Sequence, residues 1–182
     1  MIDINHLQAL TTQVRRDILR MVHKVNSGHP GGSLGCAEFL VALYFETMKH
    51  TTTFSMDGKG EDLFFLSNGH ISPVLYSVLA RSGYFKVSEL STFRKINSRL
   101  QGHPTTHEGL PGIRIASGSL GQGMSVAIGA AETKKLNGDD LITSTNGMND
   151  EYFDHQGGLI NYVWDVQDNL TLKYIGAYTD YL

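Results

Sequence analysis

Apolar residues recur at three- and four-residue steps from the beginning of the chain. The set comprises Leu7, Leu10, Val14, Ile18, Met21 and Val25. This spacing predicts an amphipathic helix over residues 3–25. We expect the helix to end in residues 26–32, since the proline and glycines there do not continue a helix. A second apolar run predicts a helix over residues 37–48.

Short apolar runs further along the chain alternate with helical patterns. Residues 63–66 are continuously apolar between polar flanks, which is typical of a strand buried on both faces, and residues 141–145 have a similar character. Helices are predicted at 72–82, 88–97 and 124–135, and a loop rich in Pro, Gly and His is predicted at 101–112. This alternation predicts an α/β fold with a mainly parallel sheet and helices on both faces, in one domain over residues 1–182.

Composition narrows the possible functions. Lys and Arg number 15 against 18 Asp and Glu, without a run of like charge, which argues against binding to nucleic acid or to an anionic membrane. Cys36 is the single cysteine, so an internal disulfide or a multi-thiolate metal site is excluded. The apolar stretch over 37–48 contains Glu38 and Glu46 and is too short to span a membrane. With no basic, apolar leader at the N-terminus, we expect a cytoplasmic protein.

Three histidines are flanked by glycine at the ends of predicted elements. They are His29, His70 and His103. In α/β sheets the loops at the carboxyl ends of the strands build the site, and glycine there allows a ligand to approach the backbone closely. Any one of them alone is more often an ordinary loop histidine, but the recurrence favours one cleft where imidazoles bind ligands and transfer protons. We expect the 118–123 loop to form part of its wall.

The glycine-rich segment over residues 118–123 opens a predicted helix. Backbone amides at such a helix start can hold a phosphate group. The spacing matches neither a dinucleotide-binding fingerprint nor a P-loop, so close helix packing through glycine and alanine is the alternative explanation.

The motifs together resemble one family. They are Gly28–Gly35, Leu66–His70 followed by Ser72–Tyr76, Leu100–Pro104 and Ser117–Gly123. Their order and spacing are similar to those of the N-terminal, thiamine-diphosphate-binding part of transketolases. The resemblance implies transfer of a two-carbon ketol unit between phosphorylated sugars, with thiamine diphosphate and Mg²⁺ or Ca²⁺ as cofactors. It also implies a part in the pentose phosphate pathway.

The resemblance also implies roles for particular residues. His29 and His103 would flank the thiazolium and the oxygens of the donor sugar, and His70 would lie against the diphosphate and the reacting centre. Gly118, Leu120 and Gly121 would contact the cofactor. The protein would bind, orient and shuttle protons, while the cofactor supplies the electron sink.

The chain departs from the family pattern after about residue 140. Where the family has Gly-Asp-Gly-Glu, this chain reads Asn146-Gly147-Met148-Asn149-Asp150-Glu151, so Met148 occupies the position of a metal-binding aspartate. A thioether is a poor ligand for a hard cation, and Asn149 or Asp150 would have to replace it. We therefore expect a truncated or diverged domain that is incomplete at its C-terminus, with doubtful metal binding.

The family's activating glutamate belongs to a pyrimidine-binding half that this chain lacks. A partner half or subunit is therefore implied, in a homo- or hetero-oligomer such as a dimer. Two alternatives stay open: a non-catalytic relative with a degraded cofactor site, and another thiamine enzyme such as a deoxyxylulose-phosphate synthase. The Gln-Gly-His-Pro motif around His103 favours a transketolase over the latter.

Overall fold

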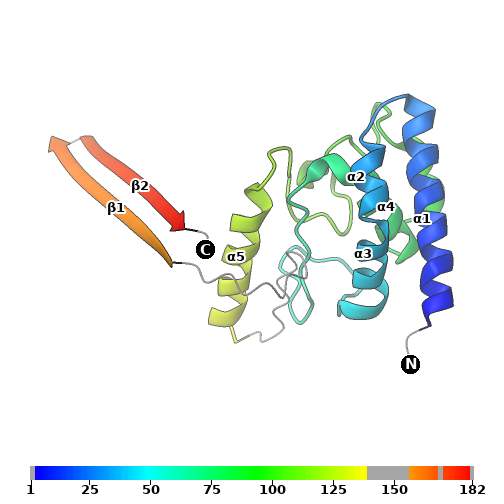
Figure 1. Cartoon of the computed structure of the whole chain (residues 1–182), viewed down its shortest axis with the longest axis horizontal. Coiled ribbons are helices and arrows are strands. Elements are labelled where there is room, and N and C mark those ends of the chain that lie inside the picture. The colour runs from blue at the N-terminus through cyan, green and yellow to red at the C-terminus, as the bar shows by residue number, and fades with distance from the viewer. Residues whose placement is uncertain (1–2, 139–155, 168–169, 181–182) are drawn as a thin grey trace. The chain divides into compact units, whose positions relative to one another are not determined.

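The computed structural model describes residues 3–138, 156–167 and 170–180 (Figure 1). The chain divides into two compact units, residues 1–146 and 147–182, each described by itself below. The predicted strand at 141–145 and the loop at 146–151 lie outside the described residues. None of the helices in the described ranges is both long and apolar enough to cross a membrane.

The first helix, α1, spans Ile4–Val25 and confirms the periodicity. The Asp3 carboxylate caps it by accepting from the His6 backbone N–H at 3.0 Å. Its buried face includes Val14, Ile18 and Met21. The helix ends at Asn26, whose φ of 48° is left-handed and cannot continue a right-handed helix.

The glycine-rich segment after α1 is more ordered than predicted. A short helix, α2, spans Pro30–Gly35, where the sequence predicted a loop. Proline at the first helical position explains this difference, because its fixed φ suits a helix start and its missing N–H has no partner there anyway. The helix predicted over 37–48 is present as α3, Ala37–Ala42, continued by a π-helical turn, η1, Leu43–Thr47.

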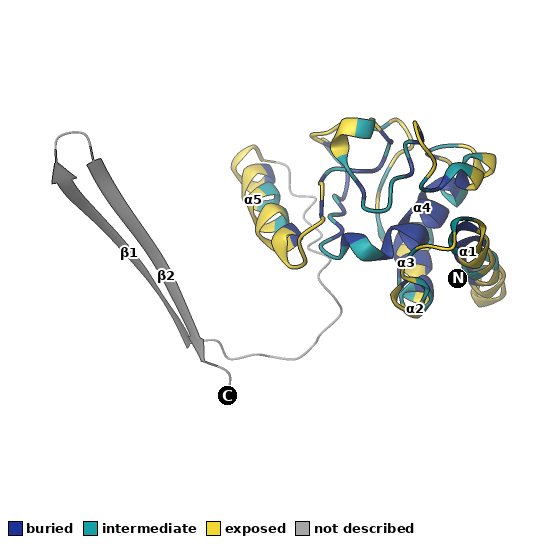
Figure 2. Ribbon diagram, turned by 90° about the horizontal axis from the view of Figure 1, so that it is seen from above, coloured by how far each residue is buried: buried dark blue, intermediate teal, exposed yellow. Residues whose placement is uncertain are grey.

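The core of the first unit is built around α4, Ser72–Arg81, which confirms the prediction at 72–82. A 3₁₀ turn, η2 (Gly69–Ile71), leads into it. Every residue of α4 before Arg81 is buried, and the helix contacts α1, α2 and α3. Figure 2 shows this buried helix beside the mostly exposed α5.

The helix predicted over 88–97 is wrong in length. Only a 3₁₀ turn, η3 (Val87–Thr92), forms there. The chain then reverses, with φ of 55° at Arg94 and 63° at Asn97, and such values do not occur within a right-handed helix. The predicted loop at 101–112 contains one further 3₁₀ turn, η4 (Thr106–Glu108).

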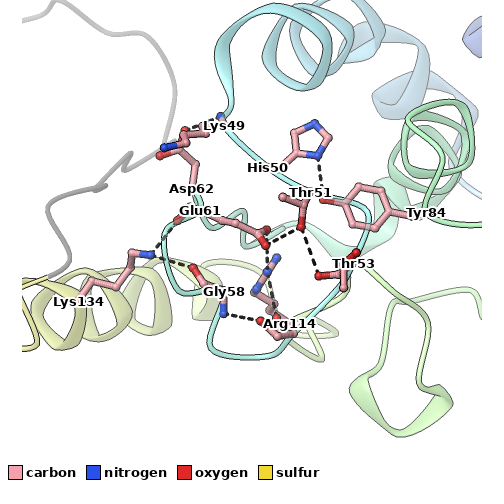
Figure 3. Close-up of polar contacts among 11 residues, drawn as sticks. Lys49, His50, Thr51, Thr53, Gly58, Glu61, Asp62, Tyr84, Arg114 and Lys134 are labelled. Carbon is pink, nitrogen blue, oxygen red and sulfur yellow. Dashed lines mark hydrogen bonds and ion pairs between the residues drawn. The ribbon is translucent and has the colours of Figure 1, made fainter.

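The last described helix of the first unit, α5, spans Gln122–Leu136 and confirms the prediction at 124–135. Its C-terminal part is held by Lys134, whose ammonium donates to the Gly58 carbonyl at 3.1 Å and the Glu61 carbonyl at 2.7 Å (Figure 3).

The predicted parallel sheet is not observed among the described residues. Phe64 and Leu66 are buried, as the prediction requires, but residues 63–66 are not assigned as a strand. A strand is defined by its ladder, and nearby only the Gly69 N–H donates across to the Ser117 carbonyl, at 3.1 Å. The parallel sheet therefore stays a prediction.

The second unit contains a hairpin. β1 (Gln156–Gln167) and β2 (Leu170–Asp180) pair antiparallel, with Tyr162 opposite Tyr174 and an irregularity between Asp165 and Gln167. The parallel arrangement expected for the fold does not describe this pair. No prediction assigned these strands, because the resemblance had faded in this segment.

Candidate functional site

The three glycine-flanked histidines lie together. The ring centroids of His29 and His70 are 5.0 Å apart, and those of His70 and His103 are 4.6 Å apart. Both pairs meet edge to face, at 83° and 87°, with His70 in the middle. Residues separated by more than seventy positions thus form one group of imidazoles. Their expected place at the carboxyl ends of strands stays a prediction, since no strand is assigned within residues 3–138.

Different elements bring each imidazole to this point. His29 is the cap residue before α2, and His70 lies in η2, directly before α4. The His103 loop is tied to α4 by two hydrogen bonds. The Ser72 hydroxyl donates to the Gly102 carbonyl at 2.7 Å, and the Tyr76 hydroxyl donates to the Gln101 carbonyl at 2.8 Å.

A close backbone approach fixes the position of His70. A Cβ at Gly69 would stand 2.9 Å from the Ser117 hydroxyl oxygen and closer still to the Ser117 carbonyl oxygen. Only glycine leaves room for the segment before His70 to lie against the segment before the glycine-rich loop.

Electrostatics favour a neutral imidazole at His103. Partial burial lowers its pKa, and the positive charges of His70, Arg94 and His29 lower it further. A neutral imidazole carries one donor nitrogen and one acceptor nitrogen. His103 is therefore able both to accept and to donate a proton in neutral solution.

Buried polar atoms without hydrogen-bond partners gather in the segments around the imidazoles. They include Ser67 Oγ, Asn68 Oδ1, His70 Nδ1, His103 Nε2 and Ser117 Oγ. Leaving such a group unpaired costs about 1–3 kcal/mol, so a concentration of them marks a place where a polar ligand gains hydrogen bonds. Amide, hydroxyl and imidazole groups suit an anionic or hydroxyl-bearing ligand.

The glycine-rich loop borders the same segments. Gly121 has a φ of 86° and precedes α5. A Cβ at Gly123 would come within 2.6 Å of Ser67 Cα, so the first turn of α5 packs against the residue three positions before His70. Gly118 and Leu120 are exposed. The cofactor contacts expected of Gly118, Leu120 and Gly121 stay predictions.

The metal site lies beyond what the structure describes. Among the described residues there is no group of three or more His, Cys, Asp or Glu side chains that could hold a metal ion. Met148, Asn149 and Asp150 lie outside the described ranges, so metal ligation by Asn149 or Asp150 stays a prediction.

A separate histidine has a structural role. His50 Nε2 lies 2.9 Å from the Tyr44 carbonyl oxygen, and its Nδ1 lies 3.0 Å from the Tyr84 hydroxyl (Figure 3). Since the carbonyl can only accept, Nε2 donates to it and Nδ1 accepts from Tyr84. Both nitrogens are therefore occupied within the core, which agrees with treating this histidine as structural.

Sequence reasoning missed several polar residues of the site. Ser67, Asn68 and Ser117 stood inside the quoted motifs, and their place next to the glycine-flanked positions was a usable signal. Arg94 gave none, because its contacts depend on an unusual backbone conformation.

Comparisons with known proteins agree with these features. The family model "Transketolase, thiamine diphosphate binding domain" matches residues 7–157. Transketolase 2 of Escherichia coli is 36% identical over 147 residues, covering 80% of this chain and 21% of that protein. One of the two subunits of an apulose-4-phosphate transketolase from Phocaeicola vulgatus is 34% identical over 140 residues, covering 77% of this chain and 49% of that protein.

A solved structure shows the same likeness. The transketolase of Campylobacter jejuni superposes with a TM-score of 0.67 at 35% identity, covering 78% of this chain and 23% of that chain. The chain thus spans about a fifth to a half of the lengths of these relatives.

Proposed function

The chain belongs to the transketolase family, through its thiamine diphosphate binding domain, and on that premise we propose that it forms the N-terminal, cofactor-binding part of a transketolase. It would act with a C-terminal, pyrimidine-binding half to transfer a two-carbon ketol unit between sugar phosphates. The observation that carries this proposal is the group of three imidazoles with unpaired polar atoms around it.

The described residues fit the cofactor. Ser67, Asn68 and Ser117 present unpaired oxygens, and His70 presents an unpaired Nδ1. By the resemblance, His70 would hold the diphosphate end, while Gly118, Leu120 and Gly121 would add backbone contacts. When bound, thiamine diphosphate supplies the carbanion and the electron sink of ketol transfer.

The other two imidazoles suit the sugar. His29 and His103 lie on either side of His70, and His29 is exposed. His103, held neutral by partial burial and neighbouring charge, can accept a hydroxyl proton and return it. We assign them the binding of the donor sugar's oxygens and the movement of its protons.

The family's metal and partner belong to the proposal as well. A divalent cation would neutralise diphosphate charge that neutral imidazoles and backbone amides balance only in part. Asn149 and Asp150 are the candidates for holding it. A partner half is supported by the coverage of the relatives, one of which is itself named as one subunit of its enzyme. We expect a dimer or higher assembly and a cytoplasmic location.

Calorimetric titration with thiamine diphosphate tests the proposal. The native chain, with and without Mg²⁺ and a C-terminal transketolase half, is compared with His70→Ala and with the matched control His23→Ala, an exposed histidine in the last turn of α1. We expect weak binding that does not need Mg²⁺ in the chain alone, and ketol transfer only with the partner half. Loss of the His70 contact should weaken binding about tenfold, while His23→Ala should not change it.

The titration also separates a second function. Met148 at the metal-ligand position favours a non-catalytic relative that retains the fold. Cofactor binding without ketol transfer in the presence of the partner half would support that relative. Absence of cofactor binding under every condition would refute the proposed function, and tight Mg²⁺-dependent binding by the chain alone would refute our interpretation of the 146–151 loop.

A further inference from the structure

Arg94 touches both loops that carry the outer imidazoles. Its Nη1 donates to the Ser27 hydroxyl at 2.9 Å, two residues before His29. On the other side, a Cβ at Gly102 would come within 2.6 Å of Arg94 Cζ, so the guanidinium lies directly against the residue before His103. One planar side chain therefore spans the gap between two loops that lie far apart in the sequence.

The backbone at Arg94 is held in place for this contact. Its φ of 55° is unfavourable for an arginine and persists only where the surroundings impose it. The Arg94 N–H donates to the Leu100 carbonyl at 2.8 Å, which closes the short loop that leads to His103. The guanidinium carbon also lies 5.5 Å from the centre of the Phe93 ring, and that ring is buried.

We infer that Arg94 is a positioning residue, whose guanidinium sets the separation of the His29 and His103 loops and so holds both imidazoles against His70. Its meaning for catalysis rests on the proposed function, but the arrangement itself does not. The charge of Arg94 adds to this role because it acts on His103 together with the charges of His70 and His29.

Nuclear magnetic resonance of the histidine rings in the full 182-residue chain tests this inference without any ligand. Ring-to-ring cross-peaks report the His29–His70 and His70–His103 contacts, and a pH titration reports the pKa of His103. Arg94→Met keeps the apolar stem but removes the charge and the hydrogen bond. We expect it to abolish the His29–His70 cross-peak and to raise the pKa of His103, because a positive charge that disfavours protonation is gone.

Two further variants separate positioning from packing. Arg94→Lys keeps the charge, so the pKa of His103 should return towards its native value, whereas a purely structural role would be served equally well by methionine. Arg99→Met is the matched control, because Arg99 pairs with Glu89 through two hydrogen bonds of 3.0 and 2.9 Å. That control should change neither the cross-peaks nor the titration.

Ser27→Ala keeps the test decisive if Arg94→Met does not fold. It removes only the hydrogen bond to the His29 loop, so we expect a weaker His29–His70 cross-peak and an unchanged His70–His103 cross-peak. Native cross-peaks in Ser27→Ala, together with native spectra or no fold in Arg94→Met, would overturn the inference. Failure of the chain to bind thiamine diphosphate would refute the proposed function and leave this result standing.

Discussion

Substituting Gly69 by alanine should damage both stability and the histidine group. The new methyl would lie 2.9 Å from Ser117 Oγ, 3.0 Å from the Ser117 carbonyl carbon and closer to its oxygen. Because these neighbours are largely backbone, the two segments must separate by about 1 Å, at an overpacking cost of about 1–3 kcal/mol. The Gly69–Ser117 hydrogen bond of 3.1 Å would weaken as well, adding about 1 kcal/mol. The expected loss in the free energy of unfolding is therefore about 2–4 kcal/mol.

Urea denaturation followed by circular dichroism measures this loss. The matched control is Gly35→Ala at the end of α2, where an added Cβ meets nothing within 4 Å, and its stability should be nearly unchanged. Since His70 follows Gly69 directly, its ring should also move away from His103, which the ring cross-peak detects. Equal stability of the two variants, with the cross-peak intact in both, would refute the close approach as the feature that fixes His70.

Three further predictions concern a buried ion pair, pH and the metal loop. Asp17→Asn should lower the free energy of unfolding by about 3 kcal/mol, because the buried Asp17 carboxylate accepts from Ser77 at 2.9 Å and Arg81 at 2.7 Å; Glu38→Gln, which breaks an exposed pair with Arg15, should cost less than about 1 kcal/mol in the same urea titration. Since the pKa of folded His103 lies below its ordinary 6.5, the unfolded chain binds more protons as the pH falls below that value, so stability should decrease there and the decrease should be smaller in His103→Gln; equal urea midpoints at about pH 5 and 7 in the native chain would contradict this. Replacing Met148 and Asn149 by Asp and Gly should leave thiamine diphosphate binding independent of Mg²⁺, because no asparagine follows at the position of the second ligand; a gain in Mg²⁺-dependent binding by calorimetry would show that the loop alone is at fault.

The sequence predicts the helices well where one face is clearly apolar. α1 and α4 follow from the spacing of their buried residues, and both ends of α1 follow from Asp3 and from the glycine-rich segment after it. Prediction failed at α2, since proline was treated as a helix breaker although it stands at a helix start. It failed again after residue 92, because left-handed backbone at Arg94 and Asn97 leaves no mark in the hydrophobic pattern.

The meeting of the three histidines could be predicted only in part. Glycine beside His29, His70 and His103 indicated close approach, and the resemblance gave their common site. Neither indicated the edge-to-face order with His70 in the centre, which depends on the packing of η2 between two loops. The bridge from Arg94 to Ser27 was unpredictable for the same reason, since it joins residues 67 positions apart.

The attachment of α5 has a consequence for hydrogen exchange. Of its residues only Gly123 and Lys134 are buried, and a cavity of about 370 Å³ lined by Phe65, Ala130 and Thr133 lies along it. A helix held at two points opens at a low free energy, whereas α4, buried along its length, opens only with the whole core. Amide protons of α5 should therefore be replaced by deuterium long before those of α4. The glycine-rich loop that precedes α5 would share this early opening, and a ligand that fixed the loop would slow the exchange of the helix behind it.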